Sequence, residues 1–334
     1  MTALSCTCGQ ITSLTRNTRM CSALALKEQQ FMPDCGLLHK KLKRLLAGIV
    51  TALLLCLPES AVASGQKSSC RRIITLAPSA TEVVYSLGLG ANLVGVSRYD
   101  SYPDGVKDLP RVGGLLDPAR ELIITLKPDL IITAASVGTP PDNLATLSAQ
   151  QLNFNHNSLS GILESITLLG NVCNKKRRAA RLINDLKKQI SAVQQRLKGV
   201  SAVSALIVIG SEPAAGLRGL YISGKDGFYN DLVRIAGGVN AYRGSTAALP
   251  SLSAEGLIAL KPEVILQIVP ETLRKNFNTA LALKFWKKYS MVPAVKSGRI
   301  YFLKKSYVYV PGPRFTMLLN DIAHYLHPEV FKNS

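Results

Sequence analysis

The sequence predicts an α/β protein of two similar lobes, each a mostly parallel sheet flanked by helices, joined by one long α-helix. Strand-like apolar runs alternate with helical patterns in both halves of the chain, which is the order that builds parallel sheets. A segment of helix, proline and strand occurs twice, as ELIITLKPDL from Glu121 and as EGLIALKPEV from Glu255. Between the copies, residues 175–198 keep apolar side chains at helical spacing. With one connecting helix, the natural place for a ligand is the cleft between the lobes.

The first 63 residues of the 334-residue chain are predicted to be an N-terminal extension and a signal peptide. HKKLKRLLAGIVTALLLCLPESAVAS has a basic start, an apolar run from Leu45 to Leu57 and an A-x-A pattern that ends at Ala63. The run is short for a membrane span, so we expect export to the periplasm with cleavage near Ala63; an uncleaved anchor is the alternative. Signal peptides lie near the initiating residue, which makes Met32 a candidate start. A lipid anchor on Cys56 is a further alternative.

Residues 64–173 are expected to form the N-terminal lobe. RIITL supplies the first strand, and PSATE starts a helix in which Ser79 and Glu82 have the spacing of a capping box. LVGVS is the next strand, and SRYDSYP is the loop after it. In LLDPARELIITLKPD, Asp117 is the expected N-cap and Pro118 the first helical residue. DLIITAA then has the continuous apolar pattern of a strand that is buried on both faces.

Residues 174–200 are the predicted linking helix, and residues 201–334 the C-terminal lobe. The linking helix has a wide polar side, so we expect it to lie along the outside of the molecule. The C-terminal lobe restarts the order of the first with the strand SALIVIG and the helix FYNDLVRIAGG. SLSAEGLIALKPEVILQIV then repeats the earlier segment, with Ser251 in the place of Asp117 and Glu255 in the place of Glu121.

Composition limits the class of protein. The chain is 47% apolar and 18% charged, and its formal net charge is +19. Such a charge suits nucleic acid, an acidic ligand or a membrane surface. Export argues against nucleic acid, and the sequence has neither an aromatic RNA-binding motif nor zinc-finger spacing. Of the seven cysteines, only Cys70 and Cys173 follow the predicted signal peptide, and the sequence leaves open whether they form a disulfide.

Catalytic motifs are incomplete, so we expect a binding protein with no cofactor and no bound metal of its own. GLYISGKD resembles a phosphate-binding loop, but Asp226 stands where a serine or threonine should hold magnesium. GLGANL lacks the third glycine of a dinucleotide fingerprint. His324 and His327 are three residues apart, but Pro328 follows at once, so we interpret them as ordinary residues at a helix end. We take His156 as a loop histidine without a special role.

The ordered motifs resemble those of the periplasmic binding proteins for cobalamin, haem and ferric siderophores, which serve ABC importers. RIITLAPSATE, GVSRYDSYP, LPRVGGL and LKPDLII carry the likeness in the first lobe, and SGKDGFYNDLVRIAGG, LSAEGLIALKPEVIL, VPAVKSGRIY and PGPR in the second. The likeness covers residues 71–329 and is nearest to the cobalamin-binding branch. It implies a protein that captures cobalamin or a related corrinoid between its lobes. A haem or ferric-siderophore binder of the same fold is the first alternative, and an exported two-lobe α/β enzyme is the second.

The resemblance also implies the ligand-binding loops. Aromatic faces suit a corrinoid disc, whereas arginine suits its phosphate or an acidic haem or siderophore. Similar cobalamin binders use tryptophans around the ligand, but the only tryptophan here is Trp286, outside these loops. Tyrosines would take over that role, or the ligand differs. The ligand-binding candidates are Ser79, Arg98, Tyr99, Tyr102, Arg111 and Gly113 in the first lobe and Arg218, Tyr242, Arg243, Leu249, Tyr307 and Tyr309 in the second.

The repeated glutamates are the candidates for contact with an ABC permease dimer. In the resembling family, one exposed glutamate of each lobe engages arginines of the permease, and Glu121 and Glu255 stand at the matching positions. Two like charges on separate lobes would fix orientation as well as attraction. The alternative is that each glutamate only complements its own helix dipole. Apart from the permease and a small-molecule ligand no partner is expected, and the mature protein is expected to be monomeric and soluble.

Overall fold

The computed structural model describes residues 70–134, 144, 147–210, 220–244, 249–269 and 274–331. These residues belong to one of two units into which the chain divides, Gly65–Ser334. The expectations about Met32, Cys56 and Ala63 lie outside the described residues, as does Arg218. None of the helices in the described ranges has the length and apolar character that a membrane crossing requires.

The N-terminal lobe is built on a four-stranded parallel sheet. Its elements are β1 (Ile73–Thr75), α2 (Pro78–Ser86), η1 (Gly90–Asn92), β2 (Leu93–Gly95), η2 (Asp104–Val106), α3 (Arg120–Thr125), β3 (Leu130–Ala134), β4 (Gln150–Phe154) and α5 (Leu159–Val172). The strand order is β2-β1-β3-β4. Ile73 and Ile132 pack with α2 and α5, whereas Ile74 and Ile131 pack with Ile123 of α3 on the other face. The central strands are therefore buried on both faces, as the continuous apolar pattern predicted.

The C-terminal lobe has a five-stranded sheet with the order β6-β5-β8-β9, and β7 also pairs with β5. Its elements are β5 (Val203–Gly210), β6 (Tyr221–Ile222), α7 (Phe228–Ile235), β7 (Gly238–Asn240), α8 (Ala254–Leu260), β8 (Val264–Ile268), α10 (Thr279–Lys287), α11 (Pro293–Lys296), β9 (Ile300–Leu303), α12 (Phe315–Leu326) and α13 (Pro328–Phe331). Only β6 among these strands is antiparallel. Helices α7 and α12 cover one face, and α8 and α10 cover the other. The prediction of two similar, mostly parallel α/β lobes is confirmed.

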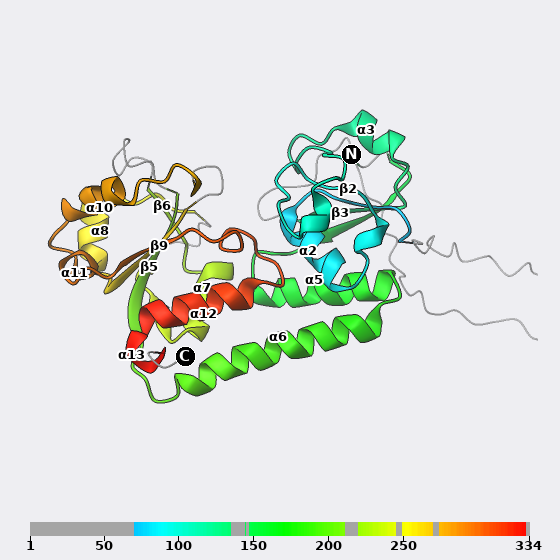
Figure 1. Ribbon diagram of the computed structural model, residues 1–334. Helices are drawn as coiled ribbons and strands as arrows, with labels where there is room; N and C mark the ends of the chain where they lie inside the picture. The colour runs from blue at the N-terminus through cyan, green and yellow to red at the C-terminus, as the bar shows by residue number, and fades with distance from the viewer. Residues whose placement is uncertain are drawn as a thin grey trace, which may run out of the picture. The chain divides into compact units, whose positions relative to one another are not determined.

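The long helix between the sheets is α6 (Lys176–Arg196). It packs against α5 of the first lobe and against α7 and α12 of the second (Figure 1). Its apolar stripe places Ala179, Leu186 and Val193 in a core that continues from the first sheet to the second. The basic side chains that alternate with this stripe are exposed, as the amphipathic pattern predicted.

The repeated segment folds in the same way in both lobes. A lysine in the left-handed conformation lies just after each of the helices α3 and α8, Lys127 with φ of 43° and Lys261 with φ of 46°. A proline follows each lysine, so the helix cannot continue and the chain turns directly into the next strand. The repeat is therefore a helix-to-strand turn that each lobe uses once.

The acidic residue after each proline joins the turn to the sheet. Asp129 accepts hydrogen bonds from the backbone N–H groups of Arg71 at 2.9 Å and Arg72 at 3.2 Å. Glu263 accepts one from the N–H of Ser204 at 2.8 Å. In both lobes the carboxylate thus satisfies N–H groups next to the first strand, which explains why the repeat keeps an acid at this position.

Two expected helix starts are wrong. Helix α2 has Ala77 as its N-cap and no side-chain cap, so Ser79 and Glu82 do not form a capping box. Asp117 does not cap α3, whose N-cap is Ala119; it binds Arg98 and the N–H of Gly114 instead. The cap of α8 is Ser253 rather than the matching Ser251, and its hydroxyl accepts from the N–H of Gly256. Local spacing missed these outcomes because the expected caps had partners elsewhere or lay two residues too early.

The two cysteines that follow the predicted signal peptide form a disulfide. Cys70 precedes β1 and Cys173 ends α5, with 103 residues of sequence separation. Both are buried in the first-lobe core. The bond closes most of the N-terminal lobe into one loop, so it restricts the unfolded chain.

We predict that the double variant Cys70→Ala/Cys173→Ala lowers the free energy of unfolding by roughly 2–5 kcal/mol, because the unfolded chain regains loop entropy. Urea titration followed by far-UV circular dichroism measures the change. Dithiothreitol should destabilise the wild type by a similar amount and leave the double variant unchanged. Equal midpoints for oxidised and reduced wild type would contradict the prediction.

One carboxyl group is buried in the loop after β2. Asp100 is 4% exposed, and neither of its carboxylate oxygens has a hydrogen-bond partner of good geometry among the described residues. Burial raises the pKa of Asp100 to about 6, and the hydroxyls of Thr81 and Ser97 and the charge of Arg111 offset the effect only in part. Its charged form therefore costs folding free energy at neutral pH.

We predict that Asp100→Asn raises the free energy of unfolding at pH 8 by roughly 1–3 kcal/mol and changes it little near pH 4. The folded state keeps a proton between about pH 4 and 6 that the unfolded state releases, so this group's contribution to stability falls as the pH rises. Urea titrations at pH 4.5, 6 and 8 measure the trend. The exposed Asp108→Asn is the control, and an equal loss of stability for Asp100→Asn at every pH would refute the assignment.

Candidate functional site

Most predicted ligand residues lie in loops that follow the carboxyl ends of parallel strands. Ser79 follows β1, residues 98–102 follow β2, residues 241–243 follow β7, and residues 307–309 follow β9. Open α/β sheets bind ligands outside the carboxyl ends of their strands. The topology therefore gathers the candidates at the expected edge of each sheet.

In the first lobe, the candidate arginines bind groups of their own loops. Arg98 forms an ion pair with Asp117 at 2.6 Å. Arg111 donates to the backbone carbonyls of Asp100 at 2.9 Å and Ser97 at 3.3 Å. Gly113 has a φ of 87°, and a side chain there would collide with the backbone carbonyl of Asp117. These residues thus shape the loops themselves.

The candidate tyrosines differ in exposure. Tyr99 is 58% exposed, Tyr102 45% and Tyr309 44%. Tyr307 is only 5% exposed, and its hydroxyl donates to Asp321 at 2.6 Å. Tyr99, Tyr102 and Tyr309 are therefore open to a ligand, whereas Tyr307 packs in the core.

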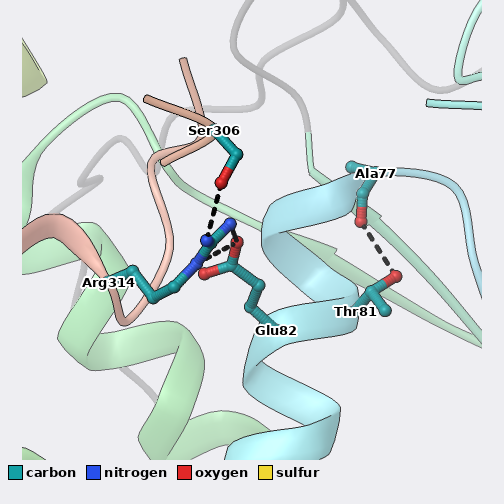
Figure 2. A network of polar contacts seen from close by, with 5 residues as sticks. All are labelled: Ala77, Thr81, Glu82, Ser306 and Arg314. Carbon is teal, nitrogen blue, oxygen red and sulfur yellow. Dashed lines mark hydrogen bonds and ion pairs between the residues drawn. The ribbon is translucent and has the colours of Figure 1, made fainter. Parts of the chain in front are cut away.

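A buried ion pair connects the loops of the two lobes. Glu82 on α2 is 3% exposed, and Arg314, at the start of α12, is 15% exposed at its side chain. Nη2 of Arg314 lies 2.6 Å from Oε1 of Glu82, and its Nε lies 3.0 Å from the same oxygen (Figure 2). Nη1 donates to the hydroxyl of Ser306 at 3.1 Å. The guanidinium group thus bridges the first lobe to the loop after β9.

Two ligand candidates contact the same arginine. The guanidinium carbon of Arg314 lies 3.8 Å from the ring centre of Tyr102 and 5.9 Å from that of Tyr307. Gly312 lies beside the pair, because a Cβ there would be 2.9 Å from Oε2 of Glu82 and 3.4 Å from Cα of Ser79. The structure therefore brings Ser79, Tyr102 and Tyr307 together around Arg314.

Sequence reasoning missed this pair. The sequence predicts a helix cap at Glu82 and no role for Arg314, although both lie in the family-like motifs PSATE and PGPR. The pairing joins residues 232 positions apart, so no local spacing indicates it. The available signal was a charged residue among apolar neighbours on α2, which requires a buried partner.

Other candidates lie elsewhere on the C-terminal lobe. Tyr242 is half-buried in the cluster on the α8 and α10 face, and its N–H donates to Asn240. Arg243 is exposed, and Leu249 is 48% exposed. Tyr242 therefore packs on the opposite face of the C-terminal sheet from Tyr307, which belongs to the core shared with α7 and α12.

A groove of about 350 Å³ lies between α5 and α6, away from the strand ends, and shares no residue with the candidate set. In the described ranges, no group of three or more histidine, cysteine or acidic residues could hold a metal ion. His156 is 2% exposed, and burial lowers its pKa to about 4, so it is neutral at physiological pH. Neither the groove nor His156 is therefore a stronger candidate for the ligand site than the loops around Arg314.

The repeated glutamates are exposed in the first turns of their helices. Glu121 lies in α3, and Glu255 lies in α8. The pKa of Glu255 is lowered because its own backbone N–H and the Ser253 hydroxyl donate to its carboxylate. Each lobe thus presents one exposed acidic side chain at the start of the helix that precedes the shared left-handed turn.

Curated relatives match most of the chain. An uncharacterized ABC transporter substrate-binding lipoprotein of Bacillus subtilis, YvrC, is 27% identical over 80% of this chain and 83% of that protein. A vitamin B12-binding protein of Pectobacterium atrosepticum is 27% identical over 83% of this chain and 93% of that protein.

Solved structures share the fold. The periplasmic vitamin B12-binding protein BtuF of Vibrio cholerae matches with a TM-score of 0.64 and 25% identity, over 79% of this chain and 98% of that chain. Periplasmic heme-binding proteins are among the other solved structures with this fold.

The model of one protein family, described as periplasmic binding protein, matches residues 73–307. This span contains both sheets and the helix between them. The chain therefore belongs to the periplasmic binding protein family.

Proposed function

We propose that this protein captures cobalamin or a related corrinoid outside the cytoplasm and delivers it to an ABC importer. The observation that carries the choice of ligand is the state of the arginines. Arg98, Arg111 and Arg314 are each engaged by groups of the protein itself. The exposed groups nearby are tyrosine rings, which suit a large and mostly uncharged disc better than an acidic one. The vitamin B12-binding relatives support this choice.

The proposed ligand contacts are the exposed rings and the small groups beside them. Tyr99, Tyr102 and Tyr309 would cover the disc, and Leu249 would add apolar surface. Ser79 and Gly113 would bring backbone groups close to its amide fringe. Arg243, and Arg218 outside the described residues, are the proposed partners for the phosphate. Arg98, Arg111, Tyr242 and Tyr307 would mainly hold the loops in shape.

A haem or ferric-siderophore ligand is the alternative in the same fold. Haem iron can be held by a tyrosine side chain. The exposed Tyr99, Tyr102 and Tyr309 are the described candidates for such a bond. The family is one of binding proteins, and the proposal gives the chain no catalytic role.

The same proposal covers location and delivery. Cleavage near Ala63 would release the exported protein in soluble form. Lipidation at Cys56 would instead anchor it, and the relative YvrC is a lipoprotein. Residues 64–173 and 201–334 would form the two lobes, with residues 174–200 as the link. The exported protein would act as a monomer, and Glu121 and Glu255 would bind basic residues of the permease dimer.

We predict that the mature protein retains cyanocobalamin through gel filtration, and that Tyr99→Ala weakens its affinity about tenfold by removing one aromatic face. Tyr99→Phe is the control, because it keeps the ring and should bind like the wild type. Visible spectra after incubation with cyanocobalamin, haemin and a ferric catecholate measure retention. Retention of haemin or the catecholate alone would move the assignment to the alternative, and retention of none would refute both.

We predict that Glu121→Arg and Glu255→Arg leave cyanocobalamin affinity unchanged and lower uptake by reconstituted transporter at least about tenfold, because like charges then face each other. Glu164→Arg, an exposed change on α5, is the matched control and should transport normally. Measuring affinity by titration and uptake in proteoliposomes separates the two steps. Loss of ligand affinity in either glutamate variant would contradict the docking role.

A further inference from the structure

All three nitrogens of the Arg314 guanidinium bind groups of the protein. Its Nε and Nη2 bind Glu82, its Nη1 binds Ser306, and its face lies on the ring of Tyr102. Three of its five N–H donors are thus directed at the protein itself rather than at a ligand. Its contacts instead connect α2 and the loop after β2 in the first lobe with the loop after β9 in the second.

Burying the Glu82–Arg314 pair costs desolvation free energy. Burial raises the pKa of Glu82 even though Arg314 opposes the rise, and Oε2 of Glu82 has no hydrogen-bond partner among the described residues. Apolar side chains of similar size can replace a buried ion pair without loss of stability. A polar pair differs in directionality, because a planar guanidinium fits a carboxylate and an aromatic face in only a few orientations.

The chain around the ion pair leaves the Glu82 carboxylate little room to move. Gly312 passes so close to Glu82 and Ser79 that a side chain would collide with the carboxylate. Other polar contacts among the described residues also cross between the lobes or reach the linking helix, such as the N–H of Leu159 to Asp231 at 3.0 Å and Arg178 to the carbonyl of Leu87 at 3.2 Å. Both involve α5 or α6, whereas the Glu82–Arg314 pair connects the loops that carry the ligand candidates.

We propose that the Glu82–Arg314 pair is an inter-lobe strut that positions Tyr102 and fixes the spacing of the two ligand-facing sides. Ligand affinity then depends on two residues that do not touch the ligand. The part of the inference that concerns affinity rests on the proposed function, whereas the part that concerns spacing does not. Glu82 and Arg314 are positioning residues in this scheme.

The test separates positioning from stability with the variant Glu82→Leu/Arg314→Met. Apolar side chains fill the same space, so the thermal midpoint should stay close to that of the wild type. We expect cyanocobalamin affinity to fall at least about tenfold, mainly through faster dissociation. Arg314→Lys keeps the charge but loses the planar contacts, and it should lie between the wild type and the double variant.

Double electron–electron resonance measures the distance between the lobes without ligand. The spin labels are attached at Asp108→Cys and Ser290→Cys, which are exposed positions in different lobes. The distance distribution should broaden in Glu82→Leu/Arg314→Met. Arg299→Met is the matched control, because Arg299 is a half-buried arginine that binds carbonyls within the C-terminal lobe. It should leave both affinity and spacing unchanged.

Unchanged spacing in the folded double variant would overturn the strut. Broader spacing with unchanged affinity would overturn its effect on the ligand. If the wild type binds no cobalamin, haemin or catecholate, the proposed function fails, and the distance measurement alone decides whether the pair is a strut.

Discussion

Strands β3 and β8 lie inside their sheets, and all five residues of each are buried. A strand that is covered on both faces needs helices on both sides, so each parallel connection must cross over the sheet through a helix. The loops that remain uncovered lie at the strand ends. This constraint accounts for the position of α2, α5, α7 and α12 on one face of the sheets and of α3, α8 and α10 on the other. It also confines the candidate site to the loops at the carboxyl edges.

The two lobes share one turn but differ in what they do with charge. The Lys-Pro-acid turn after α3 and α8 uses its carboxylate to satisfy backbone N–H groups in the adjoining sheet. The first lobe buries a glutamate, Glu82, in its α2 helix, and the second lobe supplies its arginine. The repeat thus gives both lobes the same helix-to-strand turn. The Glu82–Arg314 ion pair then joins the two lobes beside the loops that carry ligand candidates. The Cys70–Cys173 disulfide stabilises the N-terminal lobe, because both cysteines belong to that lobe.

The state of the arginines connects this polar network to the choice of ligand. A cluster of arginines in the loops at first suggests an acidic ligand, since arginine is the usual partner of carboxylate and phosphate. In the folded protein, Arg98 is matched with Asp117 and Arg314 with Glu82, so their charges are compensated before any ligand binds. Among the described candidates, the rings of Tyr99, Tyr102 and Tyr309 are exposed, as are Leu249 and Arg243. The surface that a ligand meets is therefore less basic than the sequence of these loops.

The sequence by itself determined the α/β class, the two similar lobes, the linking helix and the likeness to periplasmic binding proteins. Apolar periodicity and the repeat are local patterns, and local patterns report which elements form and which faces they bury. Only the tertiary structure decided that Cys70 pairs with Cys173, that Asp117 binds Arg98 instead of capping α3, and that Glu82 binds Arg314 instead of a helix end. The physical reason is that a polar side chain takes whichever partner the fold brings nearest when water is excluded, and that partner can be far away along the chain. Likeness to the family proposes Tyr102 and Tyr307 as ligand candidates, but the difference between an exposed ring and a buried one exists only in the folded chain.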